Sequence, residues 1–194
     1  MPDDYELPLP KSLTIDQVPG EQQQFTPLIH TPGMQVAHDR FRLRLLRQWL
    51  AHSGVAYVAA LLLDEHRIGT VGDDATGDGT DLLLNDPAGA AAWTAYVAAS
   101  RYHGRHITEQ RLLEALADEM FMAAAVAVEA GMGNTLLRLV DDTGTTRVLR
   151  PIAAPPSRDD IEQAITERTT SGQWRIWTGH AWAALPAAPA SDGR

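Results

Sequence analysis

The chain of 194 residues contains no cysteine. Disulfide bonds, zinc sites built from thiolates and thiol nucleophiles are therefore excluded. Lysine is almost absent as well, because Lys11 is the only lysine among the 16 basic residues. Since alanine is abundant too, we attribute the excess of arginine first to a bias in codon usage, and only second to a chemical role.

A long apolar run and an excess of positive charge are also missing. No apolar run approaches the roughly 20 residues that cross a bilayer, and the N-terminus lacks the basic start and apolar segment of a secretory signal. The net charge of -9 opposes general binding to nucleic acid, whose phosphates need positive partners. These absences predict a cytoplasmic protein with neither membrane nor nucleic-acid partners.

Proline is concentrated at the N-terminal end, at Pro2, Pro8, Pro10, Pro19, Pro27 and Pro32. Because proline interrupts helices and central strands, residues 1–35 are predicted to form an extended arm that lies along the domain or reaches a second copy. Residues 36–185 are predicted to form a single α+β domain. Residues 154–185 alternatively form a small helix–hairpin appendage, and residues 186–194 a disordered tail.

An apolar run at residues 55–63 predicts a buried strand, since polar residues at both ends leave too little length for a helix. Residues 68–71 and 82–84 are then its successive partners in an antiparallel meander. Residues 40–51 alternate arginine with apolar residues, which favours a strand paired with residues 55–63. The spacing of Phe41, Leu45 and Trp49 also suits a helix face.

Helix signals occupy the middle of the chain. Asp86 and Pro87 predict the start of a helix that runs to about Tyr102. Thr108 is expected to cap a longer helix of roughly 23 residues, whose apolar second half would be buried on most sides or shared with a partner. The predicted fold is therefore α+β, with an antiparallel meander and hairpins packed on a long central helix and one or two shorter helices.

Two hairpins are predicted after the long helix. Residues 135–140 and 145–150 flank an Asp-Asp-Thr-Gly turn, which is a hairpin signal. A capping box from Ser157 to Asp160 then opens a short helix. The final hairpin turns at Gly179 and His180, which places Trp177 opposite Trp182.

Contact with another protein is the function that these features favour. The candidate partner-binding residues are Arg40, Arg42, Arg44, Arg47, Trp177 and Trp182, because arginine and tryptophan are common anchors of interfaces. Two other interpretations remain open: the arginines pair with acidic residues of neighbouring strands, and the tryptophans cover the C-terminal core. We expect a non-enzymatic adaptor, inhibitor or regulatory accessory subunit, of the type found in phages and plasmids, that self-associates and needs no cofactor.

A metal-dependent hydrolase or nuclease is the alternative. Its site would use the acidic loop of residues 73–81, in which Asp74, Thr76 and Asp78 partly match the spacing of a calcium loop. His103 and His106 would supply imidazole ligands if this loop folds over the start of the long helix. Against this, the position of the bidentate glutamate is occupied by Asn85, and a solvated hairpin loop explains the same residues.

Overall fold

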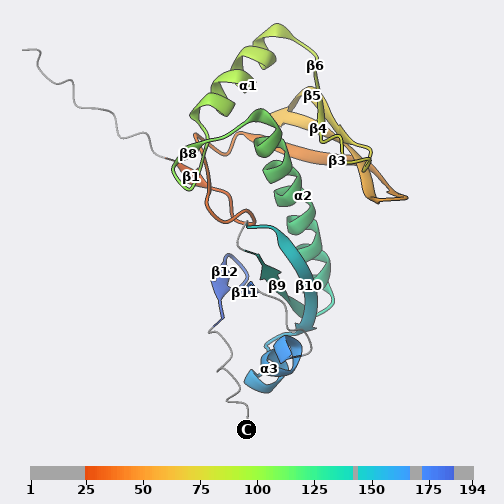
Figure 1. Cartoon of the computed structure of the whole chain (residues 1–194), viewed down its shortest axis with the longest axis vertical. Coiled ribbons are helices and arrows are strands. Elements are labelled where there is room, and N and C mark those ends of the chain that lie inside the picture. The colour runs from red at the N-terminus through yellow and green to blue at the C-terminus, as the bar shows by residue number, and fades with distance from the viewer. Residues whose placement is uncertain (1–24, 142–143, 167–171, 186–194) are drawn as a thin grey trace, which may run out of the picture.

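The computed structural model describes residues 25–141, 144–166 and 172–185. They form three antiparallel sheets of four strands each and three helices (Figure 1). The predicted α+β class is confirmed. None of the helices in these residues is both long and apolar enough to span a membrane.

Sheet B is the predicted meander. Its strands follow chain order: β3 (Phe41–Ala51), β4 (Gly54–Leu63), β5 (His66–Asp73) and β6 (Asp81–Leu84). β3 is a strand and not a helix, because it pairs with β4 along its whole length from Phe41 to Ala51. Asp64 and Glu65 make the turn between β4 and β5 with φ values of 48° and 68°, the left-handed backbone typical of a two-residue hairpin loop.

The first helix is shorter than predicted. α1 (Pro87–Ala99) begins as expected, with the Asp86 carboxylate accepting a hydrogen bond from the Gly89 backbone N–H at 2.6 Å. It stops before Tyr102 because Ser100 adopts extended backbone angles. The next two residues pair with another strand instead of continuing the helix.

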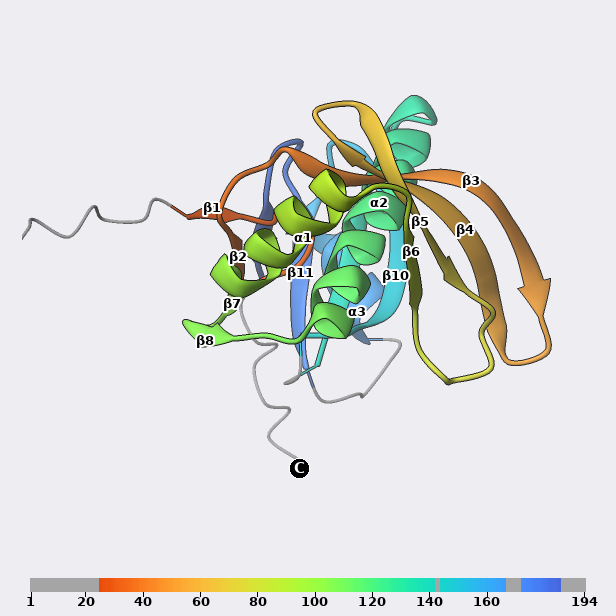
Figure 2. The same cartoon turned by 90° about the horizontal axis from the view of Figure 1, so that it is seen from above.

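The long helix has the predicted bounds. α2 (Glu109–Gly131) is 23 residues long, and the Thr108 hydroxyl accepts a hydrogen bond from the Arg111 N–H. Its fully buried residues all belong to its first half: Leu112, Leu113, Ala115, Leu116 and Ala117. α1 and α2 lie side by side on one face of sheet B (Figure 2). The apolar second half of α2 is not covered on most sides, since Val128 is 61% exposed.

Sheet A consists of very short strands that the sequence did not predict. They are β1 (Thr26–Pro27), β2 (Met34–Val36), β7 (Arg101–Tyr102) and β8 (Arg105–His106). Met34 and Val36 are completely buried in the main core. The folded part of the chain therefore begins before residue 36, whereas residues 1–24 of the predicted arm lie outside the described residues.

Sheet C contains the two later hairpins in the strand order β10-β9-β11-β12. The strands are β9 (Asn134–Val140), β10 (Thr146–Ala153), β11 (Gln173–Trp177) and β12 (Trp182–Ala184). Trp177 pairs with Trp182 as predicted. α3 (Arg158–Thr166) packs on this sheet, at the end of the molecule opposite α1 (Figure 1). The predicted tail, residues 186–194, lies outside the described residues.

Two apolar cores result from this arrangement. The main core lies between sheet B, α1, α2 and β2. The second core lies between α3 and one face of sheet C, and contains Leu137, Leu139, Ala164 and Trp174. The opposite face of sheet C meets the segment of residues 28–33 and α2, and its side chains are partly polar.

Candidate functional site

The predicted arginine set divides into two pairs with different surroundings. Arg40 donates from Nε to both carboxylate oxygens of Asp64, at 2.9 and 3.1 Å. Arg42 forms an ion pair with Glu65. Both acidic partners belong to the turn after β4, so these two arginines are engaged within their own sheet.

Arg44 and Arg47 extend along the exposed part of β3. The Arg47 guanidinium lies 5.4 Å from the centre of the Trp49 ring, a cation–π contact. No ion pair joins either arginine to a carboxylate in the part of the chain that the structure describes. Of the four predicted arginines, these two keep charge available for another molecule.

The far end of the β3–β4 hairpin carries exposed apolar side chains. β5 pairs with β4 only as far as Tyr57, so the hairpin beyond it has two strands and projects from the sheet (Figures 1 and 2). Leu50 is 86% exposed and its cross-strand partner Val55 is 51% exposed. Leu46 and Trp49 are exposed nearby. We call Leu46, Trp49, Leu50 and Val55 the apolar tip.

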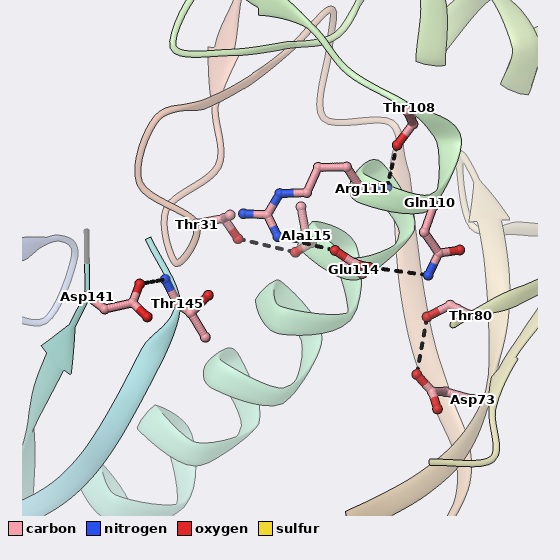
Figure 3. Close-up of polar contacts among 10 residues, drawn as sticks. All are labelled: Thr31, Asp73, Thr80, Thr108, Gln110, Arg111, Glu114, Ala115, Asp141 and Thr145. Carbon is pink, nitrogen blue, oxygen red and sulfur yellow. Dashed lines mark hydrogen bonds and ion pairs between the residues drawn. The ribbon is translucent and has the colours of Figure 1, made fainter. Parts of the chain in front are cut away.

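The acidic loop between β5 and β6 is held by hydrogen bonds of its own. Asp73 accepts a hydrogen bond from the Ala75 N–H at 2.7 Å. It also accepts one from the Thr80 hydroxyl at 3.3 Å (Figure 3). Asp74 accepts from the Thr76 N–H and hydroxyl, and these bonds lower its pKa. The Thr76 hydroxyl also lies 3.3 Å from the Asp78 carboxylate.

This loop does approach the start of α2. A β-carbon at Gly79 would lie 2.8 Å from Nε2 of Gln110 in the first turn of that helix. The histidines do not join it there: the His103 ring packs against Gly33 in the turn before β2, and His106 pairs with Arg101 in sheet A and is exposed. Within the described ranges, no three His, Asp or Glu side chains form a group that could hold a metal ion.

The two predicted tryptophans cover a buried polar cluster. Trp182 is 8% exposed, and its indole N–H donates to Nδ1 of His30 at 2.9 Å. The His30 ring stacks on Trp177, with ring centres 5.0 Å apart. Much of the tryptophan surface is therefore used inside the chain, but against this polar cluster and not over the apolar core under α3, to which neither tryptophan belongs.

Arg138, in the middle of β9, is the charged residue of this cluster and is completely buried. Its Nη1 donates to the His30 carbonyl oxygen at 2.6 Å, and its guanidinium lies 4.1 Å from the centre of the Trp182 ring. Its Nε and Nη2 have no hydrogen-bond partner among the described residues. Such unsatisfied groups are costly in a protein interior.

Glu119 of α2 binds the backbone of His30 and Thr31 from the side opposite Arg138. Its Oε1 accepts hydrogen bonds from the backbone N–H groups of His30 and Thr31, at 2.5 and 2.8 Å. The Thr31 hydroxyl donates to the Ala115 carbonyl oxygen, which ties the segment to α2 a second time (Figure 3). Residues 28–33 are therefore clamped between α2 and sheet C.

Burial determines the ionisation of this cluster. It lowers the pKa of His30 to about 4, and the charge of Arg138 acts in the same direction. The neutral ring agrees with the hydrogen bonds, because an indole only donates and Nδ1 must therefore accept. Burial also raises the pKa of Glu119 and, together with the neighbouring Arg175, lowers the pKa of Arg138 to about 10.

A hollow of about 120 Å³ adjoins the cluster. It lies between sheet A and sheet C and is lined by Pro32, Tyr102, His103, Val140, Asp141, Gly144, Gln173 and Arg175. A larger hollow of about 250 Å³ separates α3 from β10. Two of its polar side chains are engaged, since Arg150 donates to the Ala164 carbonyl and Asp160 caps α3.

Sequence reasoning missed Arg138, His30 and Glu119. A usable signal existed only for Arg138, which interrupts an otherwise apolar strand between Leu137 and Leu139. An arginine in a strand buried on both faces needs partners. Those partners lie 108 and 19 residues away in the chain, so no local pattern identifies them.

Comparison with family models, curated proteins and solved structures found no match for this chain.

Proposed function

We propose that this chain is a non-enzymatic protein-interaction module, of the adaptor, inhibitor or accessory-subunit kind, and that its partner includes a second copy of itself. The apolar tip of the β3–β4 hairpin carries the proposal. Burial within the chain stabilises Leu50 little and Val55 only in part, because Leu50 is 86% and Val55 51% exposed to water. Grouped exposed apolar side chains are typical of protein interfaces.

The neighbouring charges favour an acidic partner. Arg44 precedes the tip on the same strand and Arg47 lies between Leu46 and Trp49. Neither arginine has an ion pair within the described part of the chain. A second copy has a net charge of -9, so it offers carboxylates to them. Charge complementarity of this kind orients association, while burial of the apolar tip supplies the free energy.

Catalysis by the acidic loop has less support. Asp73 and Asp74 are occupied by hydrogen bonds of the loop itself, and the two histidines contact other parts of the chain. The metal-enzyme hypothesis required the acidic loop to lie over the start of α2, and the proximity of Gly79 to Gln110 agrees with that requirement. Without a third ligand beside the loop, we retain protein contact as the proposed function.

Sedimentation equilibrium of the full chain tests the proposal. We expect a dimer that Leu50→Glu converts largely to monomer, because each interface would then bury a charged carboxylate. Leu83→Glu is the matched control: Leu83 is 68% exposed but belongs to β6 at the other edge of sheet B, so its dimer should persist. A wild-type chain that stays monomeric at every concentration, or a dimer unaffected by Leu50→Glu, contradicts the proposal.

A further inference from the structure

Arg138 and Arg175 place two guanidinium groups next to each other on sheet C. They are direct cross-strand partners between β9 and β11, and opposite residues of an antiparallel pair project from the same face. The face is the one that meets residues 28–33, because Arg138 donates to the His30 carbonyl. Two positive charges in this position repel each other unless a negatively charged group or another hydrogen-bond acceptor lies between them or beside them.

The hydrogen-bonding capacity of this pair is not used up by the described residues. Nε and Nη2 of Arg138 and Nε of Arg175 are buried and have no partner there. The contacts that do exist are Nη1 of Arg138 to the His30 carbonyl and Nη2 of Arg175 to Oε1 of Gln173, at 2.6 and 2.9 Å. Three buried nitrogen donors on two adjacent cations therefore lack an acceptor among the described residues.

Space for an acceptor adjoins the pair. Arg175 lines the hollow of about 120 Å³, together with Val140 and Gln173 from the next cross-strand position. The other wall of the hollow includes Pro32, in the turn before β2, and Tyr102 of β7. Asp141 also lines the hollow, and its carboxylate accepts a hydrogen bond from Nε of Arg147 at 2.5 Å. This carboxylate is therefore paired with a different arginine from Arg138 and Arg175.

We propose that Arg138 and Arg175 form a binding site for one carboxylate group, which enters through this hollow. A planar guanidinium presents paired N–H groups that match the two oxygens of a carboxylate. The nearby carboxylates on α2 are Glu119, whose Oε1 is bonded to backbone N–H groups, and Asp118, and both interact electrostatically with Arg138. Neither accepts a hydrogen bond from Nε or Nη2 of Arg138, so these donors remain for a further acceptor.

The indole N–H of Trp182 is a local reporter for this site. It donates to His30, and its ring lies on the Arg138 guanidinium. We expect its ¹H–¹⁵N signal in the full chain to shift saturably with sodium acetate and not with sodium chloride at equal ionic strength. Absence of a saturable shift with acetate overturns the proposal and leaves water as the acceptor.

Two substitutions distinguish this site from general attraction of anions. Arg175→Gln should weaken acetate binding by about tenfold or more, because a charged donor is lost. Arg67→Gln is the matched control, because Arg67 is exposed on β5 of sheet B and has no part in either proposed site, and it should leave the affinity unchanged. Arg175→Lys, which keeps the charge but loses the Nε donor, should bind acetate with intermediate affinity. It replaces the glutamine variant in the test if that variant does not melt cooperatively. Equal affinity in the wild type and in the folded Arg175 variant overturns the proposal.

The source of the carboxylate is tested by comparing acetate with N-acetyl-glycyl-glycine and its C-terminal amide. Tighter binding of the peptide acid than of acetate supports a chain carboxylate as the natural ligand, and equal binding supports a small organic acid. Binding of the neutral amide as tight as that of the acid overturns the proposal, because recognition would then not depend on the carboxylate.

Discussion

Two aromatic rings and a guanidinium surround His30. Trp177 stacks on its ring, Trp182 donates to its Nδ1, and Arg138 donates to its carbonyl oxygen. Protonation of the ring would remove the acceptor for Trp182 and place a second positive charge next to Arg138. His30 is therefore a buried neutral histidine whose role in this structure is to join residues 28–33 to sheet C.

The stability of the protein should consequently fall as the pH falls from about 6.5 to about 4. The unfolded chain takes up a proton at His30 near its ordinary pKa of 6.5, whereas the folded chain does so only near 4. Each unit of that difference corresponds to about 1.4 kcal/mol, so the largest possible loss is roughly 3 kcal/mol. Urea denaturation across this pH range measures it.

The variant His30→Asn provides the comparison, because its side-chain oxygen can still accept from Trp182 while it cannot be protonated in this range. Its unfolding free energy should change less between pH 6.5 and 4 than that of the wild type. Glu119, whose raised pKa acts in the opposite direction, is present in both proteins. Identical pH profiles for the two proteins would show that His30 does not titrate with folding.

At the scale of elements, α1 shows how closely its first turn packs on sheet B. Gly89 is buried, and a β-carbon there would lie 2.9 Å from the β-carbon of Ile68 in β5. Gly131, at the end of α2, has no atom within 4 Å of the same position. A β-carbon would therefore meet packed atoms at Gly89 and open space at Gly131.

Gly89→Ala should therefore destabilise the protein and Gly131→Ala should not. Alanine is the better helix former at both sites, by up to about 1 kcal/mol. At Gly89 the forced shift of Ile68 outweighs this gain, with a net loss of about 1 to 2 kcal/mol. At Gly131 a gain of a few tenths of a kcal/mol remains. Chemical denaturation of both variants tests the packing, and a stabilising Gly89→Ala would contradict it.

The whole molecule consists of two apolar cores joined by a polar seam. Residues 28–33 lie between α2 and sheet C, which hold this segment from opposite sides, and α2 also contacts β9 directly. Glu119 supplies the hydrogen bonds from α2, and Arg138 and Trp182 supply those from sheet C. Loss of this seam should affect how the two parts unfold together.

Glu119→Ala tests the seam. It leaves the backbone N–H groups of His30 and Thr31 without their acceptor, which should cost about 2 to 4 kcal/mol. Glu114→Ala on the same helix removes only contacts with Gln110 and Arg111 and should change stability by less than about 0.5 kcal/mol. Similar unfolding free energies for the two variants, measured by denaturation, would show that the seam contributes little.

Local patterns predicted most of the elements. The apolar run of β4, the Asp86 cap of α1 and the Thr108 cap of α2 each act over a few residues, so their outcome is visible in the chain itself. The short strands of sheet A were not predicted. Pairs such as Arg101 with Gln35 join segments 66 residues apart, and two residues carry no strand periodicity.

The candidate sites show the same division. The arginines of β3 and the Trp177–Trp182 pair were predicted from alternation and from a turn. Whether they face solvent or another part of the chain depended on packing: Arg42 meets Glu65, whereas Trp182 covers Arg138. Whether any of them binds a partner remains a prediction.

By itself, the sequence determined the α+β class, the long helix and the pairing of Trp177 with Trp182 in the last hairpin, because hydrogen bonds between near neighbours and the alternation of apolar residues specify them. Only the tertiary structure decided that Arg138 would be buried beside Arg175, and that the hairpin tip would be left in water. Burial is a property of the whole arrangement of elements, and the energy of a charge or an apolar side chain depends on what surrounds it.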